Sequence, residues 1–142
     1  MKTFVVLAVS IVLVSILFCP IATAFPTLPA DLNIVQPDPS LPKELAAFFG
    51  KWWFRYPDRE TFVIVEKIDE EKASIYVWRQ GSWPQGTPTD LWTKQEARVS
   101  IERGKYKLTY QSPLGESVFS MKGDHLASTN KQYGTFHLKR VH

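Results

Sequence analysis

Tryptophan is the residue type in this sequence that is most able to form a binding site. The chain has five tryptophans, and Trp78, Trp83 and Trp92 lie close together in the sequence. Trp83 and Trp92 lie near the two ends of a predicted loop, residues 80–93, which is rich in proline and glycine. Long loops of compact domains often bind ligands, and indole rings hold apolar or aromatic molecules. These tryptophans are therefore the candidate ligand-binding residues, unless Trp83 and Trp92 fold back as a plug.

Residue patterns typical of catalysis or metal binding do not occur in the sequence. His125, His137 and His142 do not have the i, i+2 or i, i+4 spacing of metal ligands on one element. Ser82 and Ser112 lie outside any Gly-x-Ser-x-Gly motif, and no glycine-rich phosphate loop is present. We therefore expect no catalytic residue, no metal and no cofactor. A hydrolase or isomerase at a barrel mouth is the least favoured alternative.

Length and charge limit the classes of function further. The chain has 142 residues and a net charge of +3, with 44% hydrophobic and 22% charged residues. This length suits one globular domain, and the weak, dispersed charge does not favour a nucleic acid as partner.

The N-terminus has the organisation of a secretory signal peptide. Lys2 precedes an almost wholly apolar run, residues 4–18, and a small-x-small triplet follows Pro20 and ends at Ala24. We expect cleavage after Ala24 and a secreted or periplasmic protein without stable membrane insertion. An uncleaved anchor is the alternative. Cys19 is the only cysteine, so the cleaved chain would contain no disulfide.

Two segments follow the signal peptide. Residues 25–40 are rich in proline, which predicts an extended linker. Residues 41–142 form the predicted domain, which begins with a helix of about two turns that ends at Gly50.

Short stretches with alternating apolar and polar residues follow the helix. They are separated mostly by tight turns, so neighbouring strands must be antiparallel. The predicted fold is a mostly β, eight-stranded, antiparallel up-and-down barrel, because closure removes the exposed sheet edges; a β-sandwich is the alternative. The predicted strands cover residues 51–56, 61–68, 73–79, 96–102, 105–111, 116–122, 125–129 and 133–141.

Alternation also predicts which side chains face the barrel interior. Val63 and Val65 form a competing apolar face in the second strand, so its orientation is ambiguous. Trp53 is expected to face outward beneath the short helix. The predicted interior residues are Trp52, Phe62, Ile64, Ile75, Val77, Ala97, Val99, Ile101, Tyr106, Leu108, Tyr110, Phe119, Met121, Phe136 and Leu138.

A Gly-x-Trp motif opens the first strand, and an arginine lies near the end of the last strand. Gly50, Trp52 and Arg140 occupy these positions. This arrangement resembles the calycin superfamily, the lipocalins and avidins, and the chain also resembles uncharacterised small secreted bacterial domains. The resemblance implies that Arg140 stacks across Trp52 and closes the barrel. A cation–π contact of this kind is favourable in itself.

Taken together, the sequence favours a secreted, non-catalytic β-barrel module. It is expected to bind a small apolar or aromatic ligand at the open barrel end. The alternative is a protein-interaction or inhibitor module that acts on a protein partner through its outer surface. A hollow interior would favour the first function, and a filled interior would favour the second.

Overall fold

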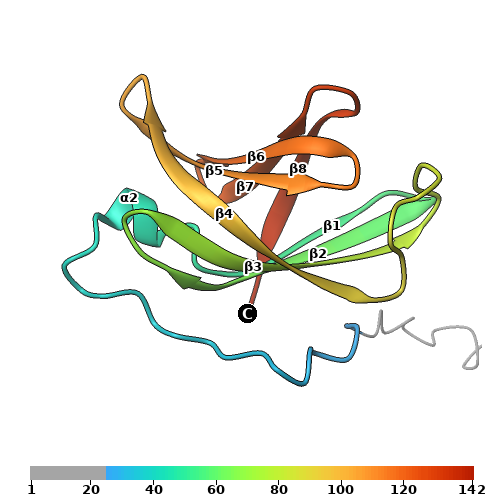
Figure 1. Cartoon of the computed structure of the whole chain (residues 1–142), viewed down its shortest axis with the longest axis horizontal. Coiled ribbons are helices and arrows are strands. Elements are labelled where there is room, and N and C mark those ends of the chain that lie inside the picture. Colours follow the sequence, from blue (N-terminus) through green and yellow to red (C-terminus); the bar gives the residue numbers. More distant parts are fainter. Residues whose placement is uncertain (1–24) are drawn as a thin grey trace, which may run out of the picture.

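A single antiparallel sheet of eight strands closes into a barrel (Figure 1). The computed structural model describes residues 25–142, so the predicted signal peptide lies outside the described residues. Each strand pairs with the next, and β8 pairs with β1. The predicted barrel is confirmed, and the β-sandwich alternative is wrong. The strands are β1 (Gly50–Arg55), β2 (Arg59–Ile68), β3 (Lys72–Gly81), β4 (Trp92–Glu102), β5 (Lys105–Ser112), β6 (Gly115–Lys122), β7 (His125–Asn130) and β8 (Gly134–Val141).

The helix α2 (Lys43–Ala46) precedes β1 and is shorter than predicted. Its single turn begins directly after Pro42, which occupies the N-cap position. Leu45 and Phe48 are buried in the same apolar cluster as Trp52, so the helical turn covers one end of the barrel.

No helix among residues 25–142 is long and apolar enough to cross a lipid bilayer.

The up-and-down order gives the barrel two different ends. The helix α2 and the β2–β3, β4–β5 and β6–β7 turns lie at one end, which we call the closed end. The remaining connections gather at the other end, which we call the open end (Figure 1). The longest of these, residues 82–91, joins β3 to β4.

The orientation of β2 differs from the prediction. Val63 and Val65 belong to the interior core, whereas Phe62 and Ile64 point outward. Register explains this, because Trp52 pairs with Val63 and both side chains lie on the inner face. Both faces of β2 are apolar, so alternation alone could not choose between them.

Two further predicted positions are corrected by the structure. Ile101 is 63% exposed instead of buried, because it lies near the tip of the β4–β5 hairpin, which extends away from the other strands (Figure 1). Trp53 does point outward, but its ring stacks on Phe62 at 6.0 Å, and its indole N–H donates to Glu60. The helix covers the barrel end, not Trp53.

A row of aromatic side chains runs across the outside of the first four strands. We call it the outer wall, and it consists of Trp53, Phe62, Trp78 and Trp92. Tyr76 and Ile64 are buried beside this row, although both face away from the barrel interior.

Residues 25–40, which we call the strap, run extended along the outside of β2 and β3 (Figure 1). The ring of Phe25 lies 4.3 Å from that of Phe62, edge to face. The Trp92 indole N–H donates to the carbonyl oxygen of Thr27 at 2.7 Å. The strap therefore covers an apolar surface that would otherwise face water.

Glu66 fixes the middle of the strap to β2. Its side chain is almost fully buried, lies 2.7 Å from the Lys94 ammonium and accepts hydrogen bonds from Ser74 and the Asn33 backbone N–H. Its carbonyl oxygen accepts from the Val35 N–H at 2.8 Å. Burial tends to raise the pKa of Glu66, but these donors together hold the pKa below its usual value.

The Glu66 contacts make the stability of the fold depend on pH. A carboxyl group whose pKa is lowered by folding stabilises the protein above its unfolded pKa, near 4.5 here, and loses that effect as the pH falls through the folded pKa. We expect Glu66→Gln to reduce the loss of unfolding free energy between pH 7 and pH 3, about the range in which carboxylates titrate. Urea unfolding at several pH values measures this loss. Glu96→Gln, which removes an exposed glutamate on β4, should behave like wild type. Equal acid sensitivity of Glu66→Gln and wild type would contradict the assignment.

The closed end is held by a cation–π contact between the first and last strands. The Arg140 guanidinium carbon lies 4.2 Å from the centroid of the Trp52 ring. The same guanidinium donates to the carbonyl oxygens of Phe49 and Ala47, both at 2.7 Å. The Trp52 indole N–H donates to the carbonyl oxygen of Phe48 at 2.9 Å. The end of the helical turn, the first strand and the last strand are thus joined around the Trp52 ring.

Gly50 is required where Arg140 crosses β1. Its φ of +121° is rarely adopted by other residues, and a Cβ atom here would lie 2.7 Å from Arg140 Nη1. The barrel and this contact are consistent with a calycin-like fold.

Removal of the Trp52 ring should destabilise the barrel strongly. Trp52 is fully buried, so we expect Trp52→Ala to lower the unfolding free energy by about 3–5 kcal/mol. Trp53→Ala is the matched control, because its half-buried ring lies on the outer wall, and its loss should be smaller. Chemical denaturation measures both. A loss below about 1 kcal/mol for Trp52→Ala would contradict the role of Trp52 as the closing core residue.

Candidate functional site

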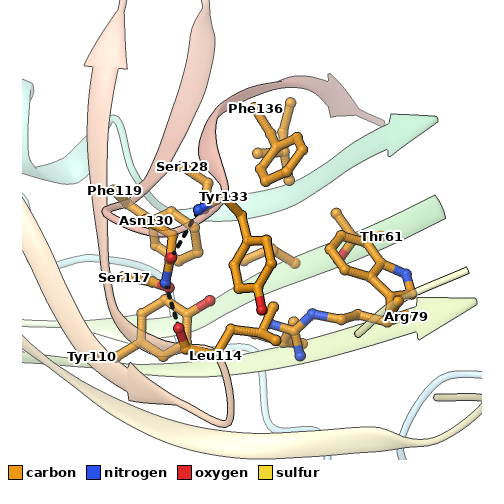
Figure 2. A pocket seen from close by; sticks show the side chains of 14 residues that line it. Thr61, Arg79, Tyr110, Leu114, Ser117, Phe119, Ser128, Asn130, Tyr133 and Phe136 are labelled. Atoms are coloured by element: carbon orange, nitrogen blue, oxygen red, sulfur yellow. Dashed lines mark hydrogen bonds between the residues drawn. The ribbon is translucent and has the colours of Figure 1, made fainter. Parts of the chain in front are cut away.

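A small cavity lies inside the barrel near the open end (Figure 2). Its volume is about 30 Å³, enough for roughly two water molecules and far below the 300 Å³ or more of typical small-molecule pockets. The interior is therefore mostly filled by side chains. The lining residues are Thr61, Val63, Val77, Arg79, Trp83, Tyr110, Leu114, Ser117, Phe119, Ser128, Asn130, Tyr133, Phe136 and Leu138.

A wider groove lies beside the cavity on the rim of the barrel. Its volume is about 340 Å³, and Tyr56, Asp58, Arg59, Tyr133 and Phe136 line it. Tyr133 and Phe136 also line the cavity, so the two spaces adjoin at these rings. Arg59 and Asp58 form a salt bridge of 3.1 Å, which leaves the groove without an uncompensated charge.

Aromatic rings cluster where the groove meets the cavity. Phe136 contacts the rings of Phe54, Trp83 and Tyr56, with centroid distances of 5.2, 6.1 and 6.5 Å. Tyr56 nevertheless remains 50% exposed. An apolar surface that stays open to solvent at a cavity mouth is typical of ligand sites.

The three predicted binding tryptophans lie on two different surfaces. Trp83 lines the cavity, whereas Trp78 and Trp92 are register partners on the outer wall, 6.5 Å apart. Trp92 also contacts the strap. Strand alternation explains the separation, because Trp78 faces outward and the next residue, Arg79, faces inward.

Trp83 forms a fixed part of the cavity edge. Its indole N–H donates to the carbonyl oxygen of Gln80 at 3.1 Å. Two guanidinium groups lie near the centroid of its ring, that of Arg59 at 5.4 Å and that of Arg79 at 5.6 Å. Both distances suit cation–π contacts.

Arg79 is one of the site residues that the sequence analysis missed. It is only 6% exposed, and among residues 25–142 it is the only charged residue that lines the cavity. A signal was present: Ile75, Val77 and Arg79 have a spacing of two residues and must share one face of β3.

Asn130 holds the β7–β8 turn that places Tyr133 over the cavity. Its side-chain amide donates to the carbonyl oxygen of Leu114, and its side-chain oxygen accepts from the backbone N–H of Tyr133 (Figure 2). The amide also donates to the carbonyl oxygen of Glu116, and the side-chain oxygen also accepts from the backbone N–H of Gln132. These bonds use much of the hydrogen-bonding capacity of this side chain. Asn130 is therefore a positioning residue. The sequence analysis missed it because its partners come from two different turns.

Tyr110 supplies a neutral hydroxyl group to the cavity. Its burial raises the pKa of the phenol, and the positive charge of Arg79 together with hydrogen bonding to Ser117 and Arg79 opposes this shift. Because the pKa remains above its usual value, the phenol stays protonated at neutral pH and can donate a hydrogen bond.

The histidines form no metal site with neighbouring residues. Among residues 25–142, no group of three or more His, Cys, Asp or Glu side chains is placed to hold a metal ion.

The burial of Arg79 leads to a stability prediction. None of the salt bridges among residues 25–142 includes this guanidinium, and a buried charge without a counter-ion is costly. We expect Arg79→Met to have the same unfolding free energy as wild type or a value up to about 2 kcal/mol higher. Chemical denaturation measures this difference. A loss of more than about 2 kcal/mol would assign Arg79 to the stabilising core instead.

Comparison of the chain with family models, with curated proteins and with solved structures finds no match. The geometry of the open end is therefore the basis for a functional assignment.

Proposed function

We propose that this protein is a binding module for a small molecule with an aromatic or apolar body, held at the open end of the barrel. The observation that carries this proposal is the aromatic cluster around Phe136, which joins the groove to the cavity and stays partly open. Rigid rings of this kind provide large contact areas at low entropic cost.

The sizes of the two spaces determine how a ligand would be divided between them. The cavity of about 30 Å³ admits only a small polar group. The groove of about 340 Å³ is large enough for one or two fused aromatic rings. The body of the ligand would therefore lie against Phe136 and Tyr56, outside the barrel core.

The cavity chemistry supports binding without catalysis. Arg79, Tyr110 and Tyr133 are the ionisable residues that line it. Burial raises the pKa of the Tyr110 phenol, which makes this hydroxyl less suited to exchange a proton near neutral pH. We also propose that the protein acts outside the cytoplasm, on the basis of the signal-peptide pattern in residues 1–24.

Binding of a protein partner through the outer wall is the second candidate function. The row of aromatic side chains on the outer wall favours it. However, the strap already covers part of this surface and contacts both Phe62 and Trp92. The open end, where no residue between 25 and 142 fills the groove, is therefore better supported.

A neutral aromatic amide tests the proposed function. We expect 2-naphthamide to bind the protein and to shift the NMR signal of the Trp83 indole N–H but not that of Trp92. Trp83→Ala should weaken binding at least about tenfold, which corresponds to about 1.4 kcal/mol. Isothermal titration calorimetry measures the affinity.

Trp92→Ala is the matched control, because it removes the same side chain from the outer wall. It should bind 2-naphthamide as wild type does. Equal weakening by the two variants, or no binding to wild type, would refute the assignment of the open end.

A further inference from the structure

Two buried charges in the described part of the chain have opposite surroundings. Glu66 and Arg79 are 4% and 6% exposed, respectively. Glu66 has an ammonium group and two hydrogen-bond donors as partners. Arg79 forms no salt bridge with any residue between 25 and 142, and no carboxylate lines the cavity that it faces. The guanidinium thus lacks the counter-ion that burial ordinarily requires.

The polar groups around Arg79 can donate hydrogen bonds, and none of them carries a negative charge. Figure 2 shows the polar ends of Arg79, Tyr110 and Tyr133 directed toward the same space. Tyr110 is buried, and burial raises the pKa of its phenol, which favours the protonated hydroxyl that can donate a hydrogen bond. Ser117 and Ser128 add hydroxyl groups to the lining. A cavity with one fixed positive charge and several O–H donors is complementary to an anion.

The walls of the cavity strengthen this preference. Val63, Val77, Phe119 and Leu138 form its apolar side, and Trp83 lies across the guanidinium. Electrostatic attraction and hydrogen bonds are stronger in such a low-dielectric environment than in water. The same environment makes an empty site unfavourable, so an anionic group that enters gains the interaction that Arg79 lacks.

We propose that the cavity binds the carboxylate of an aromatic or apolar carboxylic acid, with Arg79 as its counter-ion and the body of the acid in the adjoining groove. The inference rests on the proposed function and adds the class of ligand. A carboxylate is planar and small enough for a cavity of about 30 Å³, and it matches the fork of a guanidinium. Tyr110 and Tyr133 are placed to donate to its oxygens.

A pair of ligands with the same shape and different charge tests the proposal. We expect 2-naphthoate to bind wild type at least about tenfold more tightly than 2-naphthamide, because charge-assisted hydrogen bonds are the stronger ones. Arg79→Met should lower the affinity for 2-naphthoate at least about tenfold and change the affinity for 2-naphthamide by less than about threefold. Arg79→Lys keeps the charge but loses the fork, so its affinity for 2-naphthoate should lie between those of wild type and Arg79→Met. Titration calorimetry of all variants at neutral pH provides these ratios.

Arg98→Gln is the matched control for net charge. Arg98 is exposed on the outside of β4, away from both spaces, and its removal should alter neither affinity. Equal affinities of wild type for the acid and the amide would overturn the carboxylate assignment and leave the proposed function standing. An unchanged affinity of Arg79→Met for 2-naphthoate would also overturn it. Failure of both ligands to bind wild type would refute the proposed function and the inference together.

Discussion

Closure of the sheet between β1 and β8 is the constraint on which the rest of the structure depends. These strands share a short register of three residue pairs, so backbone hydrogen bonds alone join them weakly. The indole of Trp52 and the guanidinium of Arg140 add a side-chain contact at this seam. Arg140 also binds the backbone at the end of the helical turn. One aromatic ring therefore fixes the seam and closes one end of the barrel.

This closure leaves the opposite end free to form a site. Strands β1 and β8 have no register pairs beyond Trp53 and Lys139 toward the open end. Their continuations meet instead through the rings of Phe54 and Phe136. An eight-stranded barrel has an interior just wide enough for side chains, and here they fill it except for the cavity near Arg79. The cavity near Arg79 thus lies at the end of the barrel opposite to the contact between Trp52 and Arg140.

The outer wall shows how the strap and the barrel depend on each other. Phe62 and Ile64 are strongly apolar, yet they face away from the interior. They are buried on the outside of the sheet, where the strap lies against β2 and Glu66 binds its backbone. Proline limits the backbone freedom of the strap in the unfolded chain, so little further entropy is lost when it docks. The strap is therefore part of the folded unit that the structure describes.

Much of the fold could be predicted from the sequence because local rules determine it. The strict alternation in residues 96–111 and the tight turns between strands require antiparallel neighbours. The pairing of Trp52 with the distant Arg140 at the seam was implied by the resemblance of these residues to the calycin pattern. Arg79 had the same spacing signal, since it continues the inward face of Ile75 and Val77.

Other features were decided only by the tertiary structure. Both faces of β2 are apolar, and only its register with Trp52 and the cover of the strap select Val63 for the interior. Trp83 and Trp92 are close in sequence but lie on opposite sides of the barrel wall, because a loop returns the chain to the cavity before β4 begins outside. The counter-ion of a buried charged side chain can come from a strand that is distant in the sequence. No local sequence pattern therefore reveals whether a buried charge has a counter-ion. For this reason the sequence by itself determined the barrel and its closure, whereas the site around Arg79 depends on the packing of all eight strands.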